Sequence, residues 1–155
     1  MKIIAHRGNL SGSEPNKENT LERIQECISH GFDVEIDLRL IDKNFLLGHD
    51  EPEEKIELKE ILKLADRLWI HCKNIQVLEE FTYQNYGKQL NFFWHNKDNY
   101  TLTSKGYIWS YPQSYLSLNC ICVMPEWSMK VNNLNQIKNY NIAGICTDFP
   151  NILRK

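Results

Sequence analysis

The chain has 155 residues, of which 42% are apolar and 25% are charged, an ordinary composition for a globular protein. This composition excludes a disordered or fibrous chain, and the length predicts a single domain over residues 1–155. The formal net charge is -2 and the lysines are scattered, so the sequence lacks the broad positive surface that binds duplex nucleic acid.

Two features of the sequence predict its compartment and its redox state. No apolar run approaches the ~18 residues that a membrane-spanning helix needs, and charge interrupts residues 1–8 too early for a signal peptide. We therefore expect a cytoplasmic protein without an integral membrane segment. The five cysteines form no C-x-x-C pair, which predicts free thiols. Cys120 and Cys122 are two residues apart and project from the same face of a strand. This pattern favours buried core residues over two ligands of a metal site.

Short runs rich in Ile, Val, Phe and Trp have the length of strands rather than of helices. We expect strands at residues 2–6, 33–40, 44–49, 67–72, 90–95, 107–111, 120–124 and 143–147. A helix is expected over residues 19–31, with Asn19 as its N-cap and Gly31 at its C-terminal end. Further helices are expected at residues 57–67, 75–87 and 131–141.

The alternation of strands and helices predicts a parallel sheet built from βα units. Residues 33–40 and 44–49 are too close together for a crossover helix, so we expect them to form a hairpin. An eight-stranded βα barrel normally takes about 250 residues. The expected fold is therefore α/β, a compact and pared-down TIM-type (β/α) barrel with about seven or eight strands and reduced helices.

Ionisable side chains lie late in the expected strands or directly after them. They are His6, Glu35, Asp37, His49, His71, Lys73, His95, Glu126 and Asp148. The C-terminal ends of parallel strands converge on one face of a barrel, where residues far apart in sequence meet one substrate. The sequence therefore predicts one shared site at that face.

Two local patterns suggest the chemistry of this site. Glu35 and Asp37 project from the same face of a strand, where two like charges call for a shared proton or a bound cation. The alternative is that this strand face is simply solvated. His6 and Arg7 precede Gly8, which permits a close backbone approach and suits the binding of an anionic oxygen.

Five short motifs occur in order along the chain. They are HRG at 6–8, ENT at 18–20, GFDVEIDLRLIDKNFLLGHD at 31–50, HCK at 71–73 and TDFP at 147–150. In these motifs the chain resembles the glycerophosphodiester phosphodiesterase family, one of the phospholipase-C-like phosphodiesterase barrels. The resemblance is close over residues 3–50 and rests on two short segments thereafter.

The resemblance implies a phosphoric diester hydrolase that binds a divalent cation, most often Mg²⁺ or Ca²⁺. It implies that His6 and His49 are the proton-transfer pair that acts on a small-molecule phosphodiester, such as a glycerophosphodiester, a glycan or a lipid head group. Arg7 becomes a phosphate contact, and Lys73 is expected to neutralise charge on the same group. The residues alone do not say which histidine is the acid.

The chain departs from the family at its third expected metal ligand. Glu35 and Asp37 match the family ligands, but His71 stands where an acidic residue is usual. Imidazole suits Mn²⁺ or Zn²⁺ better than Mg²⁺ or Ca²⁺, which prefer oxygen. Glu126 is a candidate replacement carboxylate.

Two alternatives follow from the same residues. One is a non-catalytic phosphate- or glycan-binding barrel, and the other is a zinc-type hydrolase of sugars or nucleotides with His71 and His95 as ligands. The tryptophans 69, 94, 109 and 127 stack on a ring in the second alternative, although core packing is favoured for most of them. Missing helices also favour a homo-oligomer.

Overall fold

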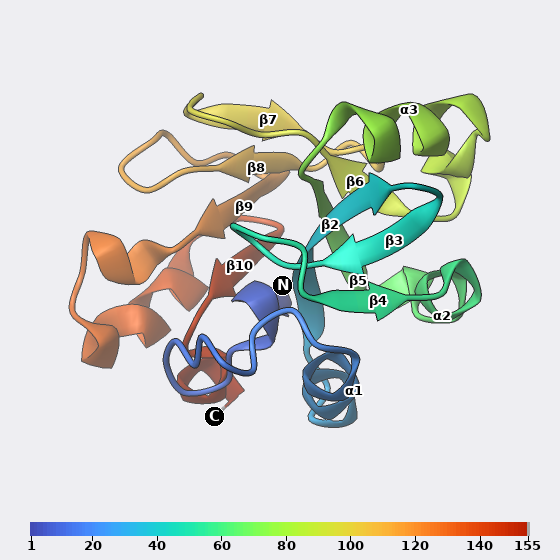
Figure 1. Ribbon diagram of the computed structural model, residues 1–155. Helices are drawn as coiled ribbons and strands as arrows, with labels where there is room; N and C mark the ends of the chain where they lie inside the picture. Colours follow the sequence, from blue (N-terminus) through green and yellow to red (C-terminus); the bar gives the residue numbers. More distant parts are fainter. Residues whose placement is uncertain (155) are drawn as a thin grey trace.

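A computed structural model describes residues 1–154, in which ten strands form one mixed sheet (Figure 1). The strands are β1 Lys2–Ala5, β2 Asp33–Ile41, β3 Asn44–Leu47, β4 Glu54–Ile56, β5 Leu68–Cys72, β6 Asn91–Phe93, β7 Tyr100–Leu102, β8 Ile108–Ser110, β9 Cys120–Val123 and β10 Gly144–Thr147. The order of the main path is β4-β3-β2-β1-β10-β9-β8-β7, and β5 pairs with β2 and β6. All eight expected strands are therefore present, and β4 and β7 are additions that the sequence pattern did not indicate.

Six parallel pairings join seven of these strands in the order β6-β5-β2-β1-β10-β9-β8. The expectation of a parallel sheet is confirmed for this part of the molecule. The expected hairpin is confirmed as well, because β2 and β3 are antiparallel with Leu38 opposite Leu47. β2 is held on both edges, since it pairs with β1 and β3 along one edge and with β5 along the other.

The expected TIM-type (β/α) barrel is wrong. Within residues 1–154 no strand pairing joins β6 to β8, so the sheet stays open, and the antiparallel β7 lies at one end of the path. The α-helices of the described chain are α1 Leu21–Ser29, α2 Leu58–Lys63 and α3 Ile75–Tyr83. The later connections are loops and 3₁₀ helices, because the chain is too short to place a helix after every strand of a closed barrel.

The described chain also contains six 3₁₀ helices. They are η1 His6–Gly8, η2 Ala65–Arg67, η3 Tyr86–Lys88, η4 Pro125–Trp127, η5 Val131–Asn139 and η6 Pro150–Arg154. Figure 1 shows the α-helices gathered beside β2 to β6, while the orange and red segments that follow β9 and β10 contain only 3₁₀ turns. The helix expected at 131–141 is therefore η5. Among the described residues, no helix combines the length and the apolar character needed to cross a membrane.

The start of α1 differs by one residue from the expected start. Thr20 is the N-cap, because its side chain accepts a hydrogen bond from the backbone N–H of Arg23. Asn19 instead has a φ of 55° and turns its side chain toward β2. Gly31 follows the helix with a φ of 90°, as expected for a residue that ends a helix in the left-handed region.

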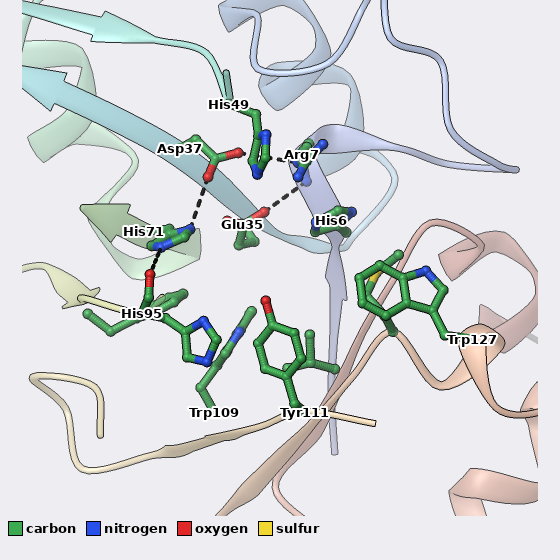
Figure 2. A pocket seen from close by; sticks show the side chains of 13 residues that line it. His6, Arg7, Glu35, Asp37, His49, His71, His95, Trp109, Tyr111 and Trp127 are labelled. Atoms are coloured by element: carbon green, nitrogen blue, oxygen red, sulfur yellow. Dashed lines mark hydrogen bonds and ion pairs between the residues drawn. The ribbon is translucent and has the colours of Figure 1, made fainter. Parts of the chain in front are cut away.

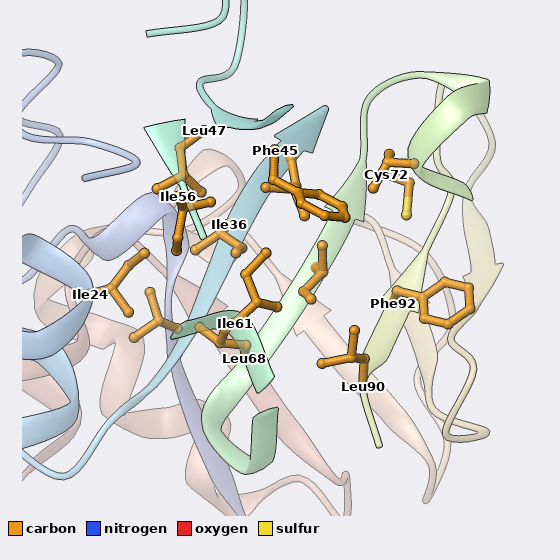
Figure 3. Packing of buried hydrophobic residues seen from close by; sticks show 14 of the residues in the cluster. Ile24, Ile36, Phe45, Leu47, Ile56, Ile61, Leu68, Cys72, Leu90 and Phe92 are labelled. Carbon is orange, nitrogen blue, oxygen red and sulfur yellow. The ribbon is translucent and has the colours of Figure 1, made fainter. Parts of the chain in front are cut away.

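The strand β2 separates the core from the site by its alternation. Val34, Ile36 and Leu38 are fully buried and pack outward, in a core shared with α1, α2 and α3 (Figure 3). Glu35 and Asp37 point to the opposite face, as side chains two residues apart in a strand must. The apolar core therefore fixes the position of both carboxylates.

Two smaller apolar clusters complete the interior. The inner one is Ile4, Trp69, Phe93, Trp109, Ile121, Val123, Met124 and Cys146, and some of its members line the cavity described below. The outer one packs η5 and η6 against β9 and β10 around Leu134 and Ile145. All five cysteines are free and buried, as expected, so Cys120 and Cys122 are core residues.

Candidate active site

A cavity of about 210 Å³ opens at the C-terminal ends of the parallel strands (Figure 2). It is lined by His6, Arg7, Glu35, Asp37, His49, His71, Phe93, His95, Trp109, Tyr111, Val123, Met124 and Trp127. Six of the seven predicted site residues belong to this lining. The seventh, Lys73, contacts Asp37 through Nζ at 3.6 Å from Oδ1.

The paired carboxylates are buried, so the alternative of a solvated strand face is wrong. Glu35 is 3% exposed and Asp37 is 1% exposed. Burial, together with the negative charge of Asp37, raises the pKa of Glu35. Burial also opposes ionisation of Asp37, but His71, Arg7 and Lys73 hold the pKa of that carboxyl well below its usual range. Two adjacent acids therefore have opposite shifts.

The HRG tripeptide of η1 brings a guanidinium to these carboxylates. Arg7 has a φ of 50°, and in this conformation its backbone N–H donates to Glu35 Oε2 at 3.1 Å. Its Nε lies 3.3 Å from Asp37 Oδ2, and its Nη1 donates to Glu18 Oε2 at 3.3 Å. Gly8 is required beside it, because a Cβ there would lie 2.8 Å from Cγ of Arg23 and the φ of Gly8 is 82°.

His71 is fixed by contacts on two sides. Its ring stacks on Phe93 with a centroid distance of 5.2 Å and an interplanar angle of 5°. Nε2 lies 3.0 Å from the backbone carbonyl oxygen of His95, and Nδ1 lies 3.0 Å from Asp37 Oδ1. A carbonyl oxygen only accepts, so Nε2 carries the proton that it donates. Nδ1 therefore faces the carboxylates.

The residues Glu35, Asp37 and His71 fit a divalent cation. One ligand atom of each lies within 4.8 Å of the others. Asp37 Oδ1 is buried and accepts no hydrogen bond of good geometry, although Nδ1 of His71 is close to it. Asn19 holds the rest of this carboxylate, since its Nδ2 donates to Oδ2 and its Oδ1 accepts from the backbone N–H of Asp37. A carboxylate oxygen beside a ring nitrogen is an arrangement that a metal ion can bridge in place of a proton.

His6 is oriented by a carboxylate from the last strand. Its Nδ1 lies 2.8 Å from Oδ1 of Asp148, which follows β10 in the TDFP motif. Burial disfavours the charged ring, but the hydrogen bond to Asp148 and the charge of Glu35 outweigh it and raise the pKa of His6. The same hydrogen bond lowers the pKa of Asp148 against the effect of burial. His6 therefore presents its Nε2 edge to the cavity.

Among the described residues, Glu126 does not belong to the cluster of candidate metal ligands, so it is not the expected replacement carboxylate. Its Oε1 accepts hydrogen bonds from Thr147 Oγ1 at 2.8 Å and from the backbone N–H of Asp148 at 2.7 Å. Burial raises the pKa of Glu126. Glu126 therefore stabilises the turn that carries Asp148, and Asp148 in turn orients His6.

His49 reaches the cavity from the loop between β3 and β4. Arg39 holds this loop, because its guanidinium donates to the backbone carbonyls of Gly48, His49 and Asp50. Gly48 has a φ of 140°, and a Cβ there would meet the carbonyl oxygen of Glu51 at 2.0 Å. His49 Nδ1 lies 2.7 Å from Asp50 Oδ1, and partial burial lowers the pKa of His49.

The far wall of the cavity is aromatic. Trp109 is buried against Phe93, at a centroid distance of 4.6 Å, and Tyr111 stacks on His95 at 4.3 Å. Trp127 stands at the mouth and is 63% exposed, with its ring centroid 6.4 Å from that of Tyr111. Figure 2 shows the hydroxyl of Tyr111 directed toward the carboxylates.

The structure also tests the expected core packing of the tryptophans and the expected zinc ligation by His95. Trp69 and Trp109 are core residues, as expected, whereas Trp94 and Trp127 are exposed. His95 does not join the cluster of candidate metal ligands in the described chain, because its Nε2 lies 2.5 Å from the carbonyl oxygen of Asp98. The pairing of His71 with His95 as zinc ligands is therefore not supported.

Several residues that support the site were not assigned a role from the sequence. Asn9 joins two of them, since its Nδ2 donates to Glu18 Oε1 and to Asp148 Oδ1, both at 2.8 Å. Glu18 and Asn19 lie in the ENT motif, where the sequence indicated no role for Glu18 and only a helix N-cap for Asn19. Arg39 gave no signal, because its partners lie in a loop nine to eleven residues away.

Comparisons with known proteins give no match: no family model, no curated protein and no solved structure is similar enough to this chain to identify its family. The geometry of the site and the sequence resemblance are therefore the two grounds for its function.

Proposed function

We propose that this protein is a cation-dependent phosphoric diester hydrolase acting on a small-molecule phosphodiester. The observation that carries the proposal is the convergence of His6, His49 and Arg7 on the cavity that also contains Glu35 and Asp37. Two imidazoles and a guanidinium beside a buried carboxylate pair provide the proton transfer and the charge needed for phosphodiester cleavage. The resemblance of the HRG and GHD segments to glycerophosphodiester phosphodiesterases supports the same reaction.

Glu35, Asp37 and His71 would hold the divalent cation. When bound, the cation supplies positive charge for a phosphate oxygen and lowers the pKa of a neighbouring hydroxyl. The other groups that act on the phosphate are side chains of the protein. The guanidinium of Arg7 is held by Asp37 and Glu18, so it is already oriented when a phosphate enters.

The two histidines divide the proton transfers between them. Asp148 keeps a proton on Nδ1 of His6 and favours the charged ring, so His6 is suited to protonate the leaving oxygen from Nε2. The pKa of His49 is lowered, so this ring is neutral in more of the pH range and is suited to accept a proton. Environments that shift two titratable groups in opposite directions indicate which one is the acid and which the base.

Replacement of each histidine tests this proposal. His6→Ala and His49→Ala are each expected to lower turnover by at least ~10²-fold, the usual contribution of a positioned acid or base. Bis(p-nitrophenyl) phosphate and a glycerophosphodiester are the substrates, each assayed with Mg²⁺, Ca²⁺, Mn²⁺ and Zn²⁺. His30→Ala is the matched control, because His30 lies at the C-terminal end of α1 outside the cavity lining. Full activity in both histidine variants contradicts the assignment.

The pH profile tests the division of roles. The base must be neutral, so activity falls as the pH drops through the lowered pKa of His49. The acid must be protonated, so activity falls again as the pH rises through the raised pKa of His6. We expect a bell-shaped kcat/KM with these two limits. In His49→Ala the acidic limb is lost while the alkaline limb remains.

The same assays separate catalysis from ligand binding. A wild-type protein that binds a phosphodiester in calorimetry but hydrolyses none of the substrates with any of these cations is a binding module, and this result contradicts the proposal.

A further inference from the structure

We infer that the cation site of the proposed function selects a first-row transition-metal ion, such as Mn²⁺ or Zn²⁺, over Mg²⁺ and Ca²⁺. The inference rests on that proposed site and concerns which metal occupies it. Three structural observations carry it: the orientation of His71, the state of the Asp37 carboxylate, and the charges that surround both.

The His71 ring has the orientation of a metal ligand. Nε2 is engaged by the backbone carbonyl oxygen of His95, at 3.0 Å. The ring plane is set by Phe93, with an interplanar angle of 5°. Metal-bound histidines usually donate their second ring N–H to a carbonyl or carboxylate in this way, which fixes the tautomer. Nδ1 then lies 3.0 Å from Asp37 Oδ1, where either a proton or a metal ion would bridge the two atoms.

The carboxylate that faces this ring offers one free oxygen. Asp37 Oδ2 accepts from Asn19 and lies beside Arg7, whereas Oδ1 lies 3.0 Å from His71 Nδ1 without a well-aligned hydrogen bond. Glu35 completes the group within 4.8 Å. One nitrogen and two carboxylates thus offer three ligand atoms within 4.8 Å of one another.

The charges around these ligands disfavour a cation that binds by electrostatic attraction alone. The two carboxylates carry two negative charges when ionised. Arg7 lies 3.3 Å from Asp37 and Lys73 lies 3.6 Å from it, so two positive charges offset them. Mg²⁺ and Ca²⁺ depend on anionic oxygen ligands, and Ca²⁺ affinity follows the ligand charge count. Mn²⁺ and Zn²⁺ also gain binding energy from coordination by imidazole, and the nearby positive charges do not cancel this contribution.

Calorimetric titration of the chelator-treated full chain measures this preference directly. MnCl₂, ZnCl₂, MgCl₂ and CaCl₂ are titrated separately at one fixed pH, because metal binding competes with protons. We expect Mn²⁺ and Zn²⁺ to bind with dissociation constants at least about tenfold lower than those of Mg²⁺ and Ca²⁺. Binding of Mg²⁺ as tightly as Mn²⁺ overturns the inference, and so does the absence of Mn²⁺ and Zn²⁺ binding.

Two substitutions at one position and a control at another localise the effect. His71→Gln is expected to weaken Mn²⁺ and Zn²⁺ binding by about tenfold or more and to change Mg²⁺ binding little. His71→Glu restores the all-oxygen set and is expected to bring the Mg²⁺ and Mn²⁺ affinities closer together. His30→Gln changes a histidine outside the cavity lining and is expected to leave Zn²⁺ affinity unchanged. If His71→Gln binds Mn²⁺ and Zn²⁺ as well as wild type, the inference is wrong.

This experiment fails separately from the proposed function. Tight Mn²⁺ or Zn²⁺ binding without hydrolysis of any phosphodiester refutes the hydrolase and leaves the metal preference intact. Hydrolysis supported equally by Mg²⁺, with equal affinities, refutes the preference and leaves the hydrolase intact.

Discussion

The two halves of the molecule contribute different chemistry to one cavity. Residues 1–93 contain every α-helix of the described chain and supply the carboxylate pair, the three proposed site histidines and Arg7. Residues 94–154 have only loops and 3₁₀ helices between their strands, and they supply the aromatic wall and Asp148. The half that keeps its helical crossovers is therefore the half that positions the side chains proposed to react.

The difference follows from how each half is packed. β2 is paired along both edges and covered by the core of α1, α2 and α3, so its two carboxylates cannot move to water. A buried like-charged pair needs such a rigid frame, because it is costly unless its partners keep their geometry. The aromatic wall needs less support, since its rings pack on one another.

The largest expected effect comes from the helical half. Asp37→Asn removes the charge that faces His71, Arg7 and Lys73, and we expect phosphodiester turnover to fall by at least about 10³-fold, or about 4 kcal/mol of transition-state stabilisation. Turnover at saturating cation is the measurement, with circular dichroism as the folding control. A folded Asp37→Asn variant with more than a tenth of the wild-type rate shows that the reacting groups are elsewhere.

The fold could be predicted from the sequence where the determinants are local. Strand positions and the hairpin of β2 and β3 follow from apolar runs and from the short spacing around Asp42. Closure of a barrel is a non-local property, because it requires β6 to pair with β8, about fifteen residues later, and β7 intervenes. The N-cap of α1 was misplaced by one residue, since Asn19 and Thr20 are both good caps and only the contact with Asp37 separates them.

Part of the site could be predicted because the C-terminal ends of the strands in a parallel sheet lie along one edge. This rule brought His6, Asp37 and His71 together without any knowledge of closure. It assigned no role to Asp148 and suggested a metal-binding role for Glu126, because a strand-end position does not reveal that Asp148 holds a histidine and Glu126 holds a turn. Such pairings depend on tertiary contacts between the first and last strands.

An intermediate effect is expected for Asp148, the carboxylate from the non-helical half that orients His6 in the proposed catalytic site. Asp148→Asn keeps the shape but removes the charge that stabilises protonated His6, so the pKa of His6 falls toward that of an unpaired ring. We expect turnover near neutral pH to fall by about 10- to 100-fold and the alkaline limb of the pH profile to move to lower pH. NMR titration of the His6 ring measures the same shift without substrate.

The outcome of that substitution sharpens the comparison of the two halves. Asp148→Glu keeps the charge and is expected to recover part of the activity. If the alkaline limb and the His6 titration are both unchanged in Asp148→Asn, then His6 takes its properties from the helical half alone.

The smallest expected effect lies at the mouth of the cavity. Trp127 is 63% exposed and touches the reacting groups only through the aromatic wall, so Trp127→Ala is expected to leave kcat nearly unchanged and to raise KM by about two- to tenfold through lost ring contact. Thermal unfolding is expected to shift little, as for other exposed positions. Trp69→Ala is the contrasting variant: its ring is 2% exposed in the inner cluster, so its replacement costs stability rather than substrate affinity. Equal KM values for Trp127→Ala and wild type would mean that the non-helical half closes the cavity without recognising the substrate.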